Sequence, residues 1–304
     1  MIQVEKLFQI AAHSGSIYSV ISDKEEALYT AGSEGIVLKW NVNEIESATV
    51  LAKVSGQVFS LLIYESLNQL WVGTMAGVVH VLDLNSKKEI HHFVNHTDSI
   101  FDIQMNSDER IYIASKDGSI SIWEAATSRF INRIQIAQDG LRKIAFHPNK
   151  KEMAIGSSDN YIYILSTENF QELYKIEAHT NSVFSLCYST DGEQLFSGGR
   201  DAMLYSWNVL NNYSELKNRP AHLFTINNII LLRGKYIATA GRDKHVKIWN
   251  GGNLELIKVL DKEKFDGHKN SVNKLTWLRG HNILVSVSDD RSMILWKINF
   301  DVNE

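Results

Sequence analysis

The stretch HTNSVFSLCYSTDGEQLFSGGRDAMLYSW, residues 179–207, contains the pattern that recurs along the rest of the chain. An apolar strand pattern over residues 183–188 is followed by a Thr-Asp-Gly turn at 190–192 and a second alternating strand at 195–198. After a polar break, a third strand is predicted over residues 203–207. Three short strands within about thirty residues cannot bury their own apolar faces, so this unit needs similar units as neighbours.

Two independent markers of this unit repeat seven times. The last apolar residue of the third strand recurs at Trp40, Leu82, Trp123, Leu165, Trp207, Trp249 and Trp296, at intervals of 42, 41, 42, 42, 42 and 47 residues. The first apolar residue of the first strand recurs in the same phase, at Ile17, Val58, Ile100, Leu141, Val183, Ile226 and Val272. Periods of about 40 to 45 residues with four short strands each predict the blades of a β-propeller.

A fourth strand is predicted after every third strand except the last, because the chain ends eight residues after Trp296. A similar strand precedes the first unit, at about residues 2–12. We expect this N-terminal strand to complete blade seven and close the ring, which removes exposed sheet edges. The sequence thus predicts an all-β, seven-bladed propeller of four-stranded antiparallel blades, in one domain over residues 1–304. Its third strands are expected to end near residues 40, 82, 123, 165, 207, 249 and 296.

The chain resembles the WD-repeat (Trp-Asp repeat) family of β-propellers along its whole length. The motif of that family has a His before the first strand, a Ser or Thr in the second, an Asp at the next turn and a Trp in the third. The matching sets are His179, Ser197, Asp201 and Trp207; His222, Thr239, Asp243 and Trp249; and His268, Ser286, Asp290 and Trp296. The Asp that would follow Trp varies, with Asn, Glu or Lys at that place: Asn41, Glu124, Asn208, Asn250 and Lys297.

Each matching set is expected to be structural. A buried carboxylate, imidazole, hydroxyl and indole N–H can bond one another at about 1 kcal/mol net per bond, and a stranded partner costs roughly 1 to 3 kcal/mol. Each set should therefore be kept whole or lost whole, and blade two has only apolar residues at these positions. Blade one has Glu34 in place of Asp, blade three has Ile113 at the hydroxyl position, and blade four keeps only Asp159. We expect these departures to weaken individual blades.

Composition excludes several classes of function. The net charge of −4 and the absence of a Lys/Arg block argue against nonspecific nucleic-acid binding. The single cysteine, Cys187, cannot form an internal disulfide and fits a reducing compartment. No signal peptide or membrane-spanning run is recognisable, so a cytoplasmic protein is expected.

The sequence contains no pattern typical of an enzyme, metal site or cofactor site. Five of the eleven histidines occupy one repeat position on five different blades, which cannot converge on one ion. The Gly-rich pieces lack the phosphate-binding GxxxxGK pattern, and there is no GxSxG nucleophile elbow. We therefore predict no catalysis, no cofactor and no bound metal.

The repeat leaves one position of the first strand free, directly after its leading apolar residue. The residues there are Tyr18, Phe59, Phe101, Arg142, Phe184, Asn227 and Asn273. Side chains alternate along a strand, so these should point toward the mouth of the central channel. The four aromatic residues would suit the anchoring of a peptide partner. The alternative is that they pack between blades without meeting a ligand, and the sequence leaves both interpretations open.

A second free position lies just before the turn Asp, and it is basic in three blades. Together with Arg142, this predicts a basic arc over blades three to six, formed by Lys116, Arg142, Arg200 and Arg242. Such an arc would suit a partner that carries carboxylates or phosphates. The alternative is a local ion pair with the adjacent turn Asp, worth under about 1 kcal/mol. The 47-residue interval lengthens the link before His268 at residues 261–267, where Phe265 could contact a partner or fold back onto the disc.

The resemblance implies a non-catalytic protein–protein interaction scaffold that binds a peptide segment or partner domain on the top face of the propeller. We expect the protein to be monomeric on its own. The alternative function is an RNA- or ribonucleoprotein-associated propeller that uses the basic arc. The candidate partner-binding residues are Tyr18, Phe59, Phe101, Arg142, Phe184, Lys116, Arg200 and Arg242.

Overall fold

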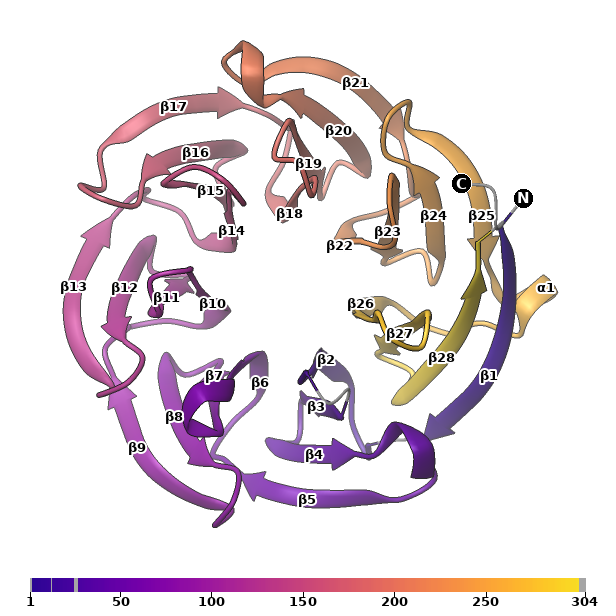
Figure 1. The fold of residues 1–304 in the computed structure, drawn as a ribbon, viewed down its shortest axis with the longest axis horizontal. Coiled ribbons are helices and arrows are strands. Elements are labelled where there is room, and N and C mark those ends of the chain that lie inside the picture. Colours follow the sequence, from indigo (N-terminus) through magenta and orange to yellow (C-terminus); the bar gives the residue numbers. More distant parts are fainter. Residues whose placement is uncertain (1, 12, 25–26, 301–304) are drawn as a thin grey trace.

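The computed structural model describes residues 2–11, 13–24 and 27–300 and contains seven four-stranded antiparallel sheets. The sheets stand as blades around a central channel, with the first strand of each blade innermost and the fourth outermost (Figure 1). The predicted fold class is therefore confirmed. That one domain spans residues 1–304 stays a prediction.

The strands of the first four blades follow one another in chain order. Blade one contains β2 (Ile17–Ser22), β3 (Leu28–Gly32), β4 (Ile36–Trp40) and β5 (Ala48–Lys53). Blade two contains β6 (Val58–Tyr64), β7 (Gln69–Thr74), β8 (Val78–Asp83) and β9 (Lys88–Val94). Blade three contains β10 (Ile100–Met105), β11 (Arg110–Ser115), β12 (Ser119–Glu124) and β13 (Arg129–Gln135). Blade four contains β14 (Leu141–Phe146), β15 (Glu152–Ser157), β16 (Tyr161–Ser166) and β17 (Glu172–Glu177).

Blades five and six follow the same order, and in blade seven the N-terminal strand supplies the fourth strand. Blade five contains β18 (Val183–Tyr188), β19 (Gln194–Gly199), β20 (Met203–Asn208) and β21 (Ser214–Pro220). Blade six contains β22 (Ile226–Leu231), β23 (Tyr236–Gly241), β24 (Val246–Asn250) and β25 (Glu255–Leu260). Blade seven contains β26 (Val272–Leu278), β27 (Ile283–Ser288), β28 (Ser292–Asn299) and β1 (Gln3–Ala11). Three 3-10 turns span Val42–Glu44, Glu65–Leu67 and Val209–Asn211.

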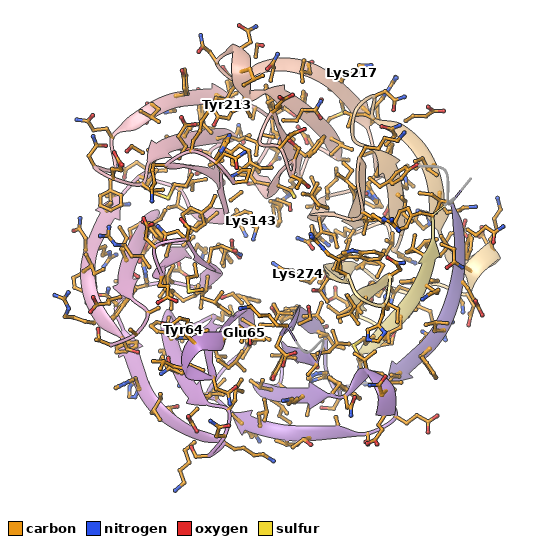
Figure 2. The ribbon with its side chains drawn as sticks, in the orientation of Figure 1. Tyr64, Glu65, Lys143, Tyr213, Lys217 and Lys274 are labelled. Atoms are coloured by element: carbon orange, nitrogen blue, oxygen red, sulfur yellow. The ribbon has the colours of Figure 1, made fainter. Side chains whose placement is uncertain are left out.

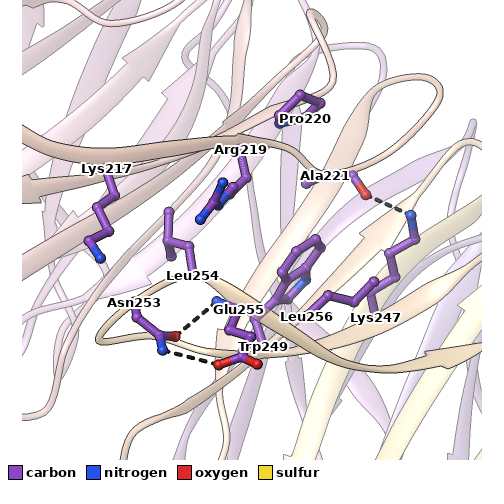
Figure 3. A pocket seen from close by; sticks show the side chains of 10 residues that line it. All are labelled: Lys217, Arg219, Pro220, Ala221, Lys247, Trp249, Asn253, Leu254, Glu255 and Leu256. Carbon is purple, nitrogen blue, oxygen red and sulfur yellow. Dashed lines mark hydrogen bonds between the residues drawn. The ribbon is translucent and has the colours of Figure 1, made fainter.

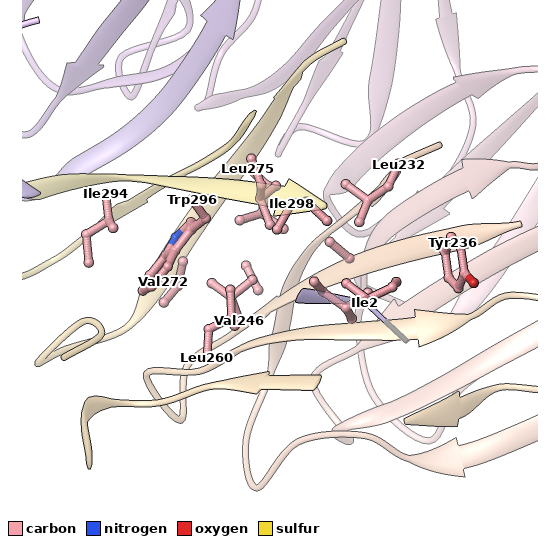
Figure 4. Packing of buried hydrophobic residues seen from close by; sticks show 14 residues of the cluster. Ile2, Leu232, Tyr236, Val246, Leu260, Val272, Leu275, Ile294, Trp296 and Ile298 are labelled. Carbon is pink, nitrogen blue, oxygen red and sulfur yellow. The ribbon is translucent and has the colours of Figure 1, made fainter. Parts of the chain in front are cut away.

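The ring is closed by pairing between β1 and β28. The register runs from Gln3 opposite Asn299 to Ala11 opposite Ser292. Ile2, just before β1, is 4% exposed and belongs to the apolar cluster between blades six and seven (Figure 4). The predicted closure is therefore confirmed, although residue 12 lies outside the described residues.

The longer link into blade seven forms the short helix α1 (Lys262–Phe265), which lies at the outer edge of the disc (Figure 1). Asp261 caps this helix by accepting a hydrogen bond from the backbone N–H of Lys264 at 2.7 Å. Phe265 packs against the cluster of blades six and seven, with its ring 6.5 Å from that of Trp296. Phe265 thus folds back onto the disc, which was one of the two predicted alternatives.

The predicted hydrogen-bond set is present in blade five, where it connects the second and third strands to the preceding loop. Trp207 Nε1 donates to Ser197 Oγ at 2.9 Å, and that hydroxyl lies 2.8 Å from His179 Nε2. His179 Nδ1 lies 2.9 Å from Asp201 Oδ1. Blades six and seven repeat this geometry, and blade one does so with the Glu34 carboxylate 2.7 Å from His13 Nδ1. A glutamate can therefore replace the aspartate in the set.

Blade three corrects the expectation that its set lacks a hydroxyl. Ile113 occupies the predicted position, but Ser121 lies directly opposite it on the neighbouring strand. Residues opposite each other on paired strands share a face of the sheet. Ser121 Oγ accepts from Trp123 Nε1 at 2.9 Å and lies 2.8 Å from His96 Nε2, so the set is complete. In blade four, Asp159 accepts from the backbone N–H of Tyr161 and from the Tyr163 hydroxyl instead.

Burial and hydrogen bonding together set the pKa values of His222 and Asp243, the most enclosed His–Asp pair among the described residues. Burial lowers the pKa of His222, against the opposing effect of its bond to Asp243. Burial alone would raise the pKa of Asp243, but the bond to His222 and the N–H of Leu223 hold it at about 2. A neutral imidazole beside a carboxylate completes the donor chain that starts at the Trp249 indole.

We expect removal of residues 2–11 to leave β28 as an exposed edge. The truncated protein should self-associate in analytical ultracentrifugation and unfold at lower urea concentration, because unpaired edges recruit other strands. A synthetic peptide with residues 2–11 should restore the monomer. A truncated protein that stays monomeric and equally stable would contradict a stabilising role for this pairing.

Substitution Ser121→Ala should lower the free energy of unfolding by about 1 to 3 kcal/mol, because it strands the buried Trp123 indole and His96 imidazole. Denaturant unfolding measures this loss. Ser60→Ala is the matched control, since Ser60 is also buried but its hydroxyl has no partner in the described structure. Equal effects of the two substitutions would show that the bonds to Ser121 contribute nothing.

Candidate functional site

Every first strand carries a β-bulge at the position that the repeat leaves free. In blade one, Ile17 pairs with Gly32 and Ser19 with Ala31, which leaves Tyr18 unpaired between them. The bulge residues of the seven blades are Tyr18, Phe59, Phe101, Arg142, Phe184, Asn227 and Asn273. A bulge redirects the side chain that it carries. All seven line one cavity of about 250 Å³, which we call the channel cavity.

Five of the bulge residues form a continuous arc around the channel cavity. The ring of Tyr18 lies 5.2 Å from that of Phe59, which lies 6.0 Å from that of Phe101. The guanidinium of Arg142 lies 4.2 Å from the Phe101 ring and 4.7 Å from the Phe184 ring. All five side chains stay half-buried. They therefore pack on one another across blades and also keep part of their surface open to the cavity.

Arg142 is held as a fixed cation within this arc. Its Nε donates to Ser158 Oγ at 2.8 Å, while its two terminal nitrogens have no hydrogen-bond partner among the described residues. Burial, together with the nearby charge of Arg200, lowers the pKa of Arg142 to about 10. The guanidinium is thus still charged at neutral pH and presents unused donors.

The two asparagines of the series tie blades together. Asn227 Nδ2 donates to the backbone oxygen of Val272 at 2.8 Å, which joins blade six to blade seven. Asn273 Nδ2 donates to the backbone oxygen of Ile17 at 2.8 Å, which joins blade seven to blade one. Their amide donors are consumed by the ring itself, so the arc of five carries the candidate binding surface.

The four residues of the predicted basic arc differ in their surroundings. Only Arg142 lines the channel cavity, and Lys116 forms an ion pair with Asp98 at 3.0 Å. Arg200 and Arg242 are exposed, and neither side chain forms a hydrogen bond or an ion pair in the described part of the chain. The turn aspartates beside them, Asp201 and Asp243, bond His179 and His222 and form no ion pair with Arg200 or Arg242 among the described residues.

Three residues that line the channel cavity were missed by the sequence analysis: Lys143, Asn228 and Lys274. Lys143 and Lys274 line the channel cavity, and both side chains reach into the channel (Figure 2). Each follows a bulge residue, at a position that is polar in all seven blades: Ser19, Ser60, Asp102, Lys143, Ser185, Asn228 and Lys274. Polar residues at a strand position where alternation predicts burial are a signal that could have indicated both the bulge and the channel lining.

A second missed feature is an apolar pair on the loop before β22. Leu223 is 76% exposed and Phe224 is 57% exposed. Arg242 lies beside this loop, since its backbone N–H donates to the oxygen of Thr225 at 2.9 Å. The corresponding loop residues of the other blades that have the histidine are mostly polar, and that contrast was visible in the sequence.

A larger cavity of about 520 Å³ lies at the rim between blades five and six (Figure 3). Its cation Lys247 donates to the backbone oxygen of Ala221, and its one ring, Trp249, is 3% exposed. The exposed Lys217 and Arg219 are the groups left to meet a ligand. This rim cavity therefore lacks the accessible aromatic rings of the channel cavity.

Within residues 2–11, 13–24 and 27–300, no three His, Cys, Asp or Glu side chains are grouped to hold a metal ion. No helix in that part of the chain is long and apolar enough to cross a membrane. Burial raises the pKa of the Cys187 thiol to about 11, so this thiol is protonated at neutral pH.

Comparisons with known proteins agree with the fold. The sequence model described as WD domain, G-beta repeat matches residues 87–124, 170–208, 216–250 and 260–297. Protein hir1 of Schizosaccharomyces pombe is 26% identical over 199 residues, which cover 54% of this chain and 21% of that protein. An uncharacterised WD repeat-containing protein of the same organism is 22% identical over 257 residues, covering 81% of this chain and 67% of that protein.

A plant relative shows the same relation. Autophagy-related protein 16 of Arabidopsis thaliana is 20% identical over 263 residues, which cover 84% of this chain and 51% of that protein. The chain thus spans about a fifth of Protein hir1 and about half of this plant protein. These distant relatives support the architecture of the chain and leave its partner to be argued from the site.

We expect Arg142→Met to lower the free energy of unfolding by about 1 to 2 kcal/mol, because it removes two cation–π contacts and the bond to Ser158. The control is Arg200→Met, which changes an exposed arginine nearby and should cost within about 0.5 kcal/mol. Denaturant unfolding compares the two. Equal losses would contradict the bridging role of Arg142.

Proposed function

The chain belongs to the WD-repeat family, and we propose that it is a non-catalytic interaction scaffold whose channel cavity binds a peptide segment or partner domain. Members of this family generally bind proteins. The single observation that carries the proposal is the arc of Tyr18, Phe59, Phe101, Arg142 and Phe184, which is continuous and still half-open to the cavity.

The contacts within the arc favour binding. Aromatic and arginine side chains dominate the energetics of most protein interfaces, especially where they sit together in a pocket. Each ring of the arc already rests on a neighbour, so binding would immobilise few additional rotamers and lose little conformational entropy. The arc therefore offers a large apolar contact area that is organised before a partner arrives.

A top-face extension of this site is formed by Leu223 and Phe224. Both are strongly exposed, and Arg242 beside them has an unpaired guanidinium in the described structure. A partner that reaches from the channel cavity across blade six would cover these side chains. Binding there would account for apolar residues in a loop that is otherwise polar.

The RNA-associated alternative receives less support. Of its basic arc, Lys116 is paired with Asp98, and only Arg142 lines the channel cavity. The chain as a whole carries a net charge of −4. A peptide site is therefore the better proposal, and a cytoplasmic, monomeric protein stays a prediction.

The proposal predicts that changing Tyr18, Phe59, Phe101 and Phe184 together to Leu abolishes partner capture. Leucine keeps much of the apolar volume and hence the packing, but it removes the flat ring faces and the cation–π contacts. The measurement compares proteins retained from an extract of the native host by the wild type and by the variant. Circular dichroism checks that the variant remains folded.

The matched control is Phe8→Leu with Phe130→Leu, since these phenylalanines are 43% and 44% exposed on outer strands far from the channel. The control should retain every partner that the wild type retains. Unchanged capture by the quadruple variant would contradict the proposed site. Loss of capture together with unfolding would identify the four residues as packing residues.

A further inference from the structure

Among the described residues, the channel cavity is lined by three cationic side chains and by no carboxylate. The cations are Arg142, Lys143 and Lys274, contributed by blades four and seven. Lys143 and Lys274 approach the channel from different sides (Figure 2). The chain as a whole is acidic, with a net charge of −4. Positive charge is therefore concentrated in the cavity, although the net charge of the whole molecule is negative.

One carboxylate nearby neutralises part of this charge. Asp102 is 2% exposed, and its Oδ2 accepts from Lys143 Nζ at 2.8 Å and from the backbone N–H of Ile144 at 3.0 Å. Its Oδ1 accepts from Gln104 Nε2 at 3.1 Å. Asp102 is thus committed to Lys143, Gln104 and the backbone of Ile144, and among the described residues it forms no hydrogen bond with Arg142 or Lys274.

Lys274 has no hydrogen-bond partner in the part of the chain that the structure describes. Burial, and then repulsion from Lys143, lower the pKa of Lys274 to about 8, although Asp102 opposes this effect. A half-buried ammonium without a partner is costly, and a nearby anion is the group that offsets this cost. The cavity thus contains unused donors at Lys274 Nζ and at the terminal nitrogens of Arg142.

We propose that the channel cavity binds an oxyanion carried on a side chain of an acidic peptide, with Lys274 as its donor. This inference rests on the proposed function and adds the chemistry of the partner. A carboxylate and a phosphate monoester share that chemistry. The volume of about 250 Å³ equals that of about eight water molecules, which is enough for either group on a short side chain.

The aromatic rings of the arc and the cationic side chains of the cavity would act together. Residues of the peptide that flank the acidic side chain would lie on the rings of Tyr18, Phe59, Phe101 and Phe184. They would cover the cavity and exclude water from it. Ion pairs strengthen as the local dielectric constant falls, so covering the cavity would strengthen the contact between the oxyanion and Lys274.

The test uses protein labelled with ¹³C at lysine Cε and three peptides: acetyl-Gly-Glu-Gly-amide, its phosphoserine equivalent and its glutamine equivalent. Titrations followed by NMR should show about tenfold tighter binding of at least one acidic peptide than of the glutamine peptide. The Lys274 resonance should shift, and its pKa should rise on binding, because an anion favours the charged form. The comparison of the two acidic peptides distinguishes carboxylate from phosphate.

Three variants locate the effect. Lys274→Gln should bring the acidic peptides to within about twofold of the glutamine peptide, and Lys274→Arg should retain most of the preference because it keeps the charge. Lys217→Gln, which removes an exposed rim lysine, should leave all affinities unchanged. If Lys274→Gln does not fold, the pKa of Lys274 in the wild type still decides the outcome.

Equal affinity for the glutamine and acidic peptides, or an unchanged Lys274 pKa, would overturn the inference. The proposed function is judged separately by the quadruple leucine variant. If that variant loses its partner while Lys274→Gln retains it, the scaffold proposal stands and the oxyanion subsite is wrong. If neither variant loses the partner, both proposals are wrong.

Discussion

No blade of this protein can bury its own faces, and this constraint organises the whole molecule. The apolar clusters cross blade boundaries: Val246 and Leu260 of blade six pack with Val272 and Trp296 of blade seven. Each sheet is therefore stable only between two neighbours. The first and last blades can meet this condition only by packing against each other, so the ring must close. Surfaces on its axis then become available for binding.

The bulge at the second residue of each first strand serves two purposes in one layer of the structure. Where the bulge residue is Asn227 or Asn273, it donates to the next blade and strengthens the ring. Where it is aromatic, or Arg142, it rests on its neighbour and leaves surface open. The asparagines thus join neighbouring blades but offer no free amide donors to a partner, whereas the aromatic residues and Arg142 leave part of their surface accessible. The candidate site lies on the blades that carry the aromatic residues and Arg142.

The blade count, the ring closure and the hydrogen-bond sets could be predicted because each depends on local pattern. What could not be predicted depends on pairing between strands. Ser121 replaces the expected hydroxyl from across the sheet, because its opposite neighbour Ile113 presents the same face. Lys143 and Lys274 reach the channel because a bulge shifts the alternation by one residue. Phe265 packs onto the disc from the short helix α1, which Asp261 caps and which lies in an insertion outside the repeat.

The pairing of β1 with β28 has a consequence for how the molecule is made. A ribosome releases β1 before any other strand of the ring and releases β28 only after the other six blades. Until β28 is synthesised, β1 therefore lacks its pairing partner, and its apolar residues are not covered by blade seven. The last step of maturation joins the two most distant strands of the chain, and long-range pairing of this kind is slow.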